Sequence, residues 1–178
     1  MGSRRLARQF AFSILHSLDY LDRSTKKTIK NFWKSCEAEE VLAADEQPLI
    51  ARKIEDDEQD FAKILVEGTW KNREIIDDLI SKTSLNWAIN RIATVDKTIL
   101  RLAIYELLFE ESIPVNVSID EAIELAKRYG EVSQSSLQNR ASSHFVNGIL
   151  DTIASQYAQE KLEKNKKNNK TKAKSKKK

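Results

Sequence analysis

Three arginines stand near the start of the chain, where guanidinium groups could bind a nucleic acid. Apolar residues recur with helical spacing over residues 4–20, which predicts a helix with one buried stripe. The face opposite that stripe is expected to carry Arg5, Arg8, Gln9, Phe12 and His16, with Arg4 in the same first turn. A guanidinium fork matches phosphate oxygens, an aromatic ring stacks on an unpaired base, and an amide reads a base edge. The pattern predicts a surface for single-stranded RNA, but it also fits an ordinary basic helix end with Phe12 packed on a neighbouring helix.

The residues that usually carry catalysis are few and widely separated. The two histidines, His16 and His144, are far apart in the sequence, and Cys36 is near neither. Metal-binding spacings such as Cys-x-x-Cys, the Gly-x-Ser-x-Gly nucleophile motif and a glycine-rich phosphate loop do not occur in the sequence. The adjacent acids Asp56-Asp57 and Asp77-Asp78 diverge on a helix, which favours a solvated face over a catalytic pair. The sequence therefore predicts a protein that is not an enzyme and that uses no metal or cofactor.

Composition and charge divide the chain into a predicted domain and a basic tail. Of the 178 residues, 40% are hydrophobic, which is enough for one buried core within residues 1–163. Residues 164–178 carry nine lysines and no acid, which predicts a disordered tail that either keeps the protein soluble or serves as a non-specific RNA arm. Neither a long apolar run nor a secretory signal is present, and the single cysteine fits a reducing compartment. We therefore expect a cytoplasmic protein.

Helical periodicity dominates the sequence, because only two prolines and four glycines interrupt it. An all-α fold is predicted, with helices over residues 4–20, 25–36, 48–68, 71–81, 95–109, 118–130 and 141–162 and a short turn over 85–92. The helix over 95–109 is apolar on nearly all sides and is expected at the centre of the bundle. Its polar residues Arg101, Tyr105 and Glu106 are therefore expected to pair inside the protein.

The segment after Pro114 has the spacing of a capped helix. Ser118 and Glu121 fit a capping box, in which the serine is the first cap residue and the glutamate returns to its backbone amide. Gly130 suits a left-handed residue just beyond the last turn. The pattern predicts that these residues mark the two ends of one helix.

Several strings of residues together resemble the NusB family, and they follow one another in the family's order and spacing. They are RRLARQFA at residues 4–11, NW at 86–87, RI at 91–92, DKTILRLAIYEL at 96–107, IPV at 113–115, IDEAIELAK at 119–127 and FVNGILD at 145–151. The resemblance covers residues 4–154. Each string is short, and it is their common order that makes the resemblance specific.

The resemblance implies two small helical bundles packed into one globular domain of about seven helices. It also implies a function, because family members bind the boxA element of nascent ribosomal RNA together with NusE, a ribosomal small-subunit protein, and join an antitermination complex on RNA polymerase. The positions that match the family's RNA-binding arginines are Arg4, Arg5 and Arg8. Phe145 matches a position near the RNA, and Asp96 falls in the region that faces NusE. Some relatives dimerise, so the resemblance is also compatible with a homodimer that covers the arginine face.

The sequence departs from the family's usual pattern in places that bear on binding. His16 stands where tyrosine is common, and the stretch over residues 131–143, just before Phe145, is longer than usual. Two other functions remain open. One is a pure protein-interaction module, and the other is an RNA-targeting domain like the one attached to some ribosomal RNA methyltransferases, although no methyltransferase domain follows in this sequence.

Overall fold

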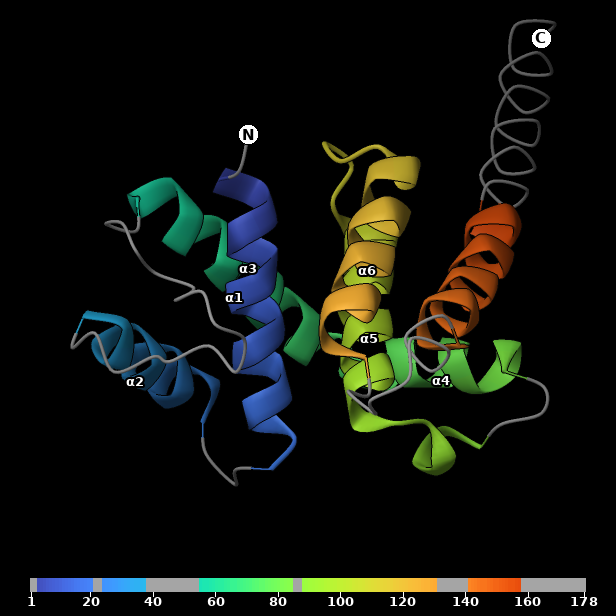
Figure 1. Ribbon diagram of the computed structural model, residues 1–178, viewed down its shortest axis with the longest axis horizontal. Helices are drawn as coiled ribbons and strands as arrows, with labels where there is room; N and C mark the ends of the chain where they lie inside the picture. Colours follow the sequence, from blue (N-terminus) through green and yellow to red (C-terminus); the bar gives the residue numbers. More distant parts are fainter. Residues whose placement is uncertain (1–2, 21–23, 38–54, 85–87, 131–140, 158–178) are drawn as a thin grey trace, which may run out of the picture.

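The computed structural model describes residues 3–20, 24–37, 55–84, 88–130 and 141–157, which form helices and turns (Figure 1). The helices are α1 (Ser3–Leu18), α2 (Thr25–Glu37), α3 (Asp56–Lys71), α4 (Arg73–Thr83), the short 3₁₀ helix η1 (Ile89–Arg91), α5 (Thr94–Phe109), α6 (Val115–Tyr129) and a last helix over residues 141–157. No strand occurs in these ranges. The all-α prediction is confirmed.

The helices form two groups that pack against each other. α1, α2 and α3 lie on one side of the molecule, and α4, α5, α6 and the helix over 141–157 lie on the other (Figure 1). The groups meet where α1 and α3 pack on α5. This arrangement agrees with the two packed bundles that the resemblance implies.

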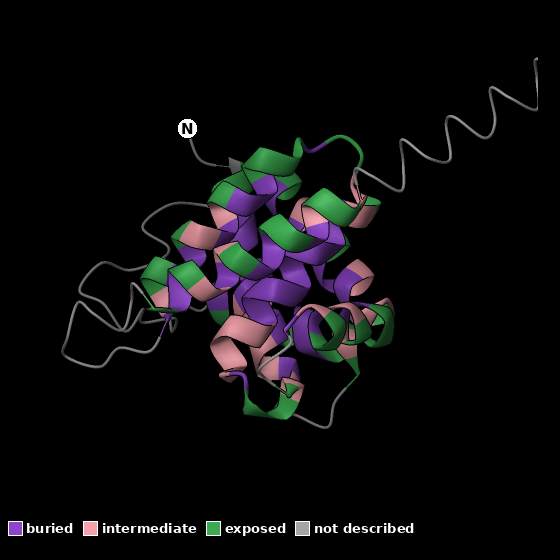
Figure 2. Cartoon of the chain, turned by 90° about the vertical axis from the view of Figure 1, so that its right-hand side faces the viewer, coloured by how far each residue is buried: buried purple, intermediate pink, exposed green. Residues whose placement is uncertain are grey.

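The central helix is α5, because an element that is apolar on nearly all sides needs neighbours all round. Every residue from Thr98 to Leu107 is buried, and Figure 2 shows buried residues gathered in the middle of the fold. α3 approaches α5 closely at Gly68, where an added Cβ would lie 2.1 Å from Cζ of Tyr105. Gly68 therefore serves packing, and α3 runs through it to Lys71 instead of ending near it as predicted.

α6 begins earlier than the capping-box pattern predicts. The residue before its first turn is Pro114, so Ser118 and Glu121 lie inside the helix and the predicted capping box is wrong. The last turn ends at Gly130 with a φ of −54°, so the left-handed conformation predicted there is also wrong. Glycine is required for another reason, since an added Cβ would lie 2.4 Å from the backbone oxygen of Ala126 and 2.8 Å from Oγ of Ser142.

Four features predicted from the sequence lie outside the described residues. They are the helix start at Pro48, the turn around Trp87, most of the stretch 131–143 and the lysine tail at 164–178. Among the helices that are described, none is both long and apolar enough to cross a lipid bilayer.

Candidate nucleic-acid interface

Arg8 is inside the protein and does not face solvent. Its Nε and Nη2 donate to the two carboxylate oxygens of Glu106 at 2.8 and 2.9 Å, and the two side chains are 5% and 2% exposed. The hydroxyl of Ser118 donates a third bond to Glu106, at 3.0 Å. The predicted exposure of Arg8 is wrong, because α5 and α6 cover this side of α1. The ion pair fixes α1 to the other helix group.

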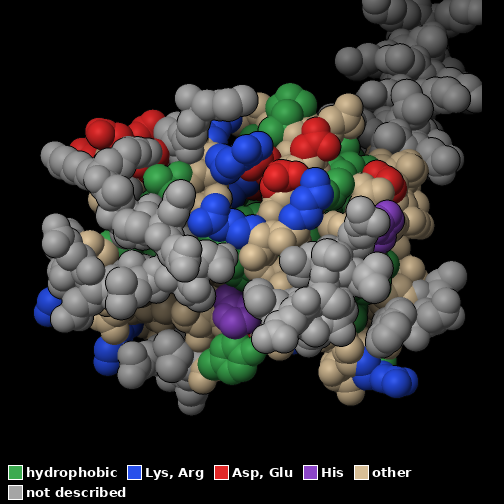
Figure 3. Space-filling view, viewed as in Figure 1, with side chains coloured by type: hydrophobic (Ala, Val, Ile, Leu, Met, Phe, Trp, Pro, Cys, Tyr) green, Lys and Arg blue, Asp and Glu red, His purple; other side chains and the backbone are tan. Residues whose placement is uncertain are grey.

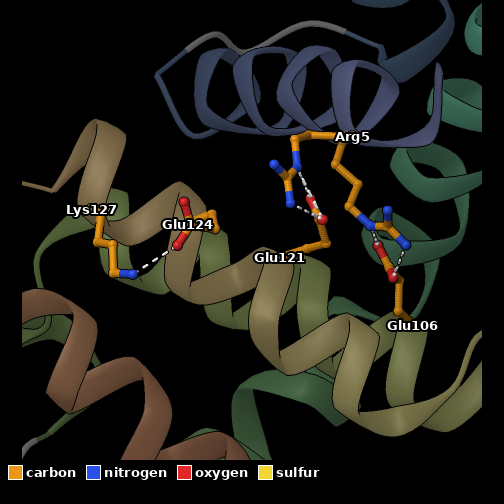
Figure 4. A network of polar contacts seen from close by, with 6 residues as sticks. Arg5, Glu106, Glu121, Glu124 and Lys127 are labelled. Atoms are coloured by element: carbon orange, nitrogen blue, oxygen red, sulfur yellow. Dashed lines mark hydrogen bonds and ion pairs between the residues drawn. The ribbon is translucent and has the colours of Figure 1, made fainter. Parts of the chain in front are cut away.

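Arg5 lies at the surface and holds a different carboxylate. Its Nε and Nη2 donate to Oε1 of Glu121 at 3.0 and 2.8 Å (Figure 4). The Arg5 side chain is 53% exposed, whereas that of Glu121 is 14% exposed. The hydrogen bond to Glu121, together with the charge of that carboxylate, raises the pKa of Arg5. Because solvent screens an exposed pair, its contribution to stability is about 0.2–1 kcal/mol, and a phosphate group can compete for the same guanidinium.

Arg4 is the second exposed guanidinium of α1. Its Cζ lies 5.2 Å from the ring centroid of Phe61 on α3, and the Cζ of Arg8 lies 5.5 Å from the same ring. A cation over an aromatic face is attracted by the ring quadrupole and can keep its outer donors in water. Arg4 and Arg5, but not Arg8, are therefore placed to meet an anionic ligand.

Phe12 is also buried, with 5% of its surface exposed. It stacks on Tyr129 of α6 with ring centroids 4.7 Å apart, so the predicted open position is wrong and the alternative, packing on a neighbouring helix, is confirmed. The row continues with the ring of His16 on α1 and the ring of Tyr20 just beyond the helix, at centroid distances of 5.7 and 5.2 Å. Burial lowers the pKa of His16, although the charge of Asp19 opposes this shift. His16 is half-buried and Tyr20 is 66% exposed, so these two rings are the accessible end of the row.

A cleft of about 260 Å³ lies between α1 and the second half of α6. Arg5 and Gln9 line it from α1, and Glu124, Lys127 and Arg128 line it from α6. Lys127 donates to Glu124 at 2.7 Å (Figure 4), and this bond lowers the pKa of Glu124. Basic and acidic side chains alternate over the same face of the molecule (Figure 3). The cleft thus brings together the predicted residues Arg5 and Gln9 with cations that the sequence pattern did not indicate.

Asp96 and Phe145 do not line this cleft. Asp96 is half-buried in the first turn of α5 and accepts a hydrogen bond from the hydroxyl of Ser142. Phe145 is half-buried and packs against the hydrophobic core. Asp96 therefore lies where α5 meets the start of the helix over 141–157, and Phe145 lies near the start of that helix.

The polar residues of α5 pair inside the protein, as predicted. Arg101 donates to Asp77 of α4 at 2.6 and 2.8 Å and to Asp19 at 2.8 and 3.0 Å. Burial opposes the charge of Arg101, but the bonds to the two carboxylates outweigh it and raise its pKa. Burial and a 2.9 Å bond to Glu110 raise the pKa of Tyr105 to about 12. Asp77 therefore belongs to a partly buried ion pair with Arg101, in which its own side chain is 25% exposed, and its predicted place on a solvated face is wrong.

The residues of α6 that face the arginines were missed because the sequence pattern assigned Glu121 to a cap. A usable signal was present: Glu121, Glu124 and Arg128 recur at helical spacing and share one face. In the ranges that the structure describes, no group of three His, Cys, Asp or Glu side chains could hold a metal ion. The fold and the site together define an all-helical protein with an exposed arginine face suited to an extended anion.

The comparisons with known proteins assign the chain to a family. The model of the NusB family matches residues 5–155, and the chain belongs to that family. It is 39% identical over 153 residues to the transcription antitermination protein NusB of Syntrophus aciditrophicus (strain SB), which covers 86% of this chain and 80% of that protein. A solved structure of T. maritima NusB matches with a TM-score of 0.68 at 34% identity and covers 92% of this chain and 98% of that one. A solved structure of the antitermination factors NusB and NusE in complex with dsRNA has a TM-score of 0.68 at 26% identity, covering 88% of this chain and 99% of that one.

Proposed function

We propose that this chain is a transcription antitermination factor that binds the boxA element of nascent ribosomal RNA together with NusE, and that it joins RNA polymerase without catalysing a reaction. Family membership supports this proposal, as does the similarity to a solved complex of NusB and NusE with dsRNA. The observation that carries it is the exposed guanidinium of Arg5 at a cleft that other cations also line.

The proposed RNA surface follows the exposed side of α1. Arg4 and Arg5 bind phosphate oxygens, Gln9 meets a base edge at the cleft, and the accessible ring of His16 stacks on an unpaired base. Phe145 contributes from the start of the helix over 141–157. Arg8 and Phe12 were matched or expected as direct contacts, but their burial supports an indirect role for both, in which they hold α1 and α6 in place.

A titration of labelled boxA RNA, read by fluorescence anisotropy with and without NusE, tests the proposal. We expect boxA to bind more tightly than a scrambled RNA, and we expect Arg5→Ala to weaken binding roughly tenfold because a charge-assisted bond to phosphate is lost. Lys82→Ala is the matched control, since Lys82 is an exposed cation of α4 paired with Asp78. Equal affinity for boxA and scrambled RNA in both conditions would refute the proposal.

Glu121→Gln gives a test in the opposite direction. The change removes the carboxylate charge that competes with phosphate for Arg5, so RNA affinity should rise several-fold while helicity stays the same. A fall in affinity would mean that Glu121 is needed to orient Arg5 and that the guanidinium does not bind phosphate by replacing this carboxylate.

We further propose that the region around Asp96 meets NusE. Asp96→Asn should weaken the capture of NusE by the immobilised chain, because it removes a charge at the junction of α5 and the helix over 141–157. Ser142→Ala is the matched control, since it removes the hydrogen bond to Asp96 and leaves the charge. If both variants capture NusE like the parent protein, the NusE surface lies elsewhere.

One observation favours a second function, that of a pure protein-interaction module. Arg5 and Arg8 both bind carboxylates of the same chain, so two of the three arginines of α1 already have an anionic partner. If the purified chain captures NusE but the pair ignores boxA RNA at low salt, this second function replaces the first. Light scattering with and without RNA would show in the same samples whether a homodimer covers the arginine face.

A further inference from the structure

Arg128, in the last turn of α6, differs from the other cations that line the α1–α6 cleft. Glu121 is bound by Arg5 and Glu124 is bound by Lys127, so both lining carboxylates already hold a cation. Arg128 is exposed, and within the described part of the chain its guanidinium contacts an aromatic ring and not a carboxylate. It therefore supplies the excess positive charge of this cleft.

The side chain of Arg128 is restrained by a contact with an aromatic stack. Its Cζ lies 5.6 Å from the ring centroid of Tyr129, and Tyr129 stacks on the buried ring of Phe12 at 4.7 Å. A guanidinium held over a ring keeps its in-plane donors available for a second partner. Because the stack restrains Arg128 from the side of α1, less conformational entropy is lost when it binds a ligand.

The chemistry around the cleft favours a nucleic-acid strand over an acidic peptide. Phe12, the ring at the base of the stack, is also next to His16, and His16 is next to the exposed ring of Tyr20. Cations in the cleft, with the accessible rings of His16 and Tyr20 farther along the same row, suit a polymer that alternates phosphates and flat bases. An acidic peptide would use the cations and leave these rings without a partner.

We infer that the α1–α6 cleft receives one phosphate group of single-stranded RNA and that Arg128 is the residue that binds it. Arg128 and Arg5 approach this phosphate from opposite walls, and Gln9 lines the α1 wall beside Arg5. The inference rests on the proposed RNA-binding function, and it adds α6 to a surface that the sequence placed on α1.

The test is an anisotropy titration of the full chain with boxA RNA and with scrambled RNA at several salt concentrations. Arg128→Ala should weaken both RNAs by roughly tenfold, because a phosphate contact carries no sequence information. The slope of log affinity against log salt should shrink by about 0.7, the value for one phosphate of a single strand. Arg128→Lys should keep this slope and lose only part of the affinity, since it keeps the charge but not the planar fork.

Arg73→Ala is the matched control, because the Cζ of Arg73 lies 4.4 Å from the ring of Trp70 at the junction of α3 and α4, the same kind of contact on another element. Unchanged RNA binding by Arg73→Ala supports the inference, and a loss equal to that of Arg128→Ala would overturn it in favour of a net-charge effect.

Parent-like affinity and slope for Arg128→Ala, with loss in Arg5→Ala, would also overturn it while leaving the proposed function intact. Loss of NusE capture without loss of RNA binding would identify a protein ligand instead and would equally overturn it. A parent chain that does not prefer boxA would contradict the proposed function, and the salt slope would still decide the phosphate contact.

Discussion

Arg8→Ala is expected to destabilise the fold far more than it affects RNA directly. The Arg8–Glu106 pair has two short bonds, at 2.8 and 2.9 Å, between side chains that are 5% and 2% exposed. Removing the arginine leaves the carboxylate of Glu106 buried with only the hydroxyl of Ser118 as a described donor. Breaking a buried pair in this way costs about 3–5 kcal/mol. The exposed pair of Arg5 and Glu121 has the same chemistry, yet Arg5→Ala should cost only about 0.2–1 kcal/mol.

Urea denaturation followed by far-UV circular dichroism, at fixed pH and salt, measures both changes. The double change of Arg8→Met with Glu106→Leu should be less destabilising than either single loss of a partner, because it leaves no unpaired ion inside the protein. Under conditions in which the variant is folded, Arg8→Ala should retain most of the RNA affinity of the parent chain. An unchanged urea midpoint together with a loss of RNA binding would refute the reasoning, because it would show that Arg8 meets RNA directly.

Three further outcomes follow from packing and charge. Asp77→Asn should lower the free energy of unfolding by about 1.5–3 kcal/mol, because it removes a charge-assisted bond to Arg101, which Asp19 still holds. Asp78→Asn, on the same turn but 58% exposed, should change the free energy of unfolding by less than about 0.5 kcal/mol. Equal effects would contradict the burial difference. Burial holds the pKa of His16 below 6.5, so the unfolded chain binds this proton more tightly and stability falls as pH drops below 6.5. His16→Gln should therefore flatten the decline in urea midpoint between about pH 7.5 and about pH 5.5. An unaltered decline would show that His16 is not its source. Gly68→Ala places a Cβ 2.1 Å from the ring of Tyr105 and should cost at least about 1–3 kcal/mol in thermal unfolding, while a parent-like melting temperature would show that the ring can move away.

Much of the fold could be predicted from the sequence because hydrophobic periodicity is strong in several segments. The run over residues 95–109 is apolar around its whole circumference, and α5 is the central helix. The same reasoning predicted that Arg101 and Glu106 each have a partner inside the protein, since a charged side chain on such a helix cannot reach water. Periodicity says which residues share a face of one helix, but it does not say which partner each buried charge will find.

The candidate site was predicted less well, and α1 shows the physical reason. Its apolar stripe was correct, but a second neighbour covers the adjacent stripe that contains Arg8 and Phe12. The sequence held one clue, because Arg8 and Phe12 recur with Leu15 at helical spacing and a leucine there indicates burial. A short-range pattern also misassigned Ser118 and Glu121 as a cap. Both residues instead meet groups brought in from distant parts of the chain, Glu106 and Arg5, and a local motif carries no information about such long-range contacts.

The carboxylate of Glu106 joins three helices, since α5 carries it, Arg8 of α1 donates to it, and Ser118 of α6 donates to it. Both walls of the cleft, α1 and α6, are therefore bound to one buried carboxylate. Neither helix can move away without exposing this carboxylate to solvent or removing one of its hydrogen-bond donors. The hydrogen-bonded backbone amides inside α1 and α6 should consequently exchange with solvent deuterium only through global unfolding, as one cooperative unit. A chain built in this way presents its binding face fully formed or not at all, so a mutation that lowers global stability weakens binding only through the fraction of chains that it leaves unfolded.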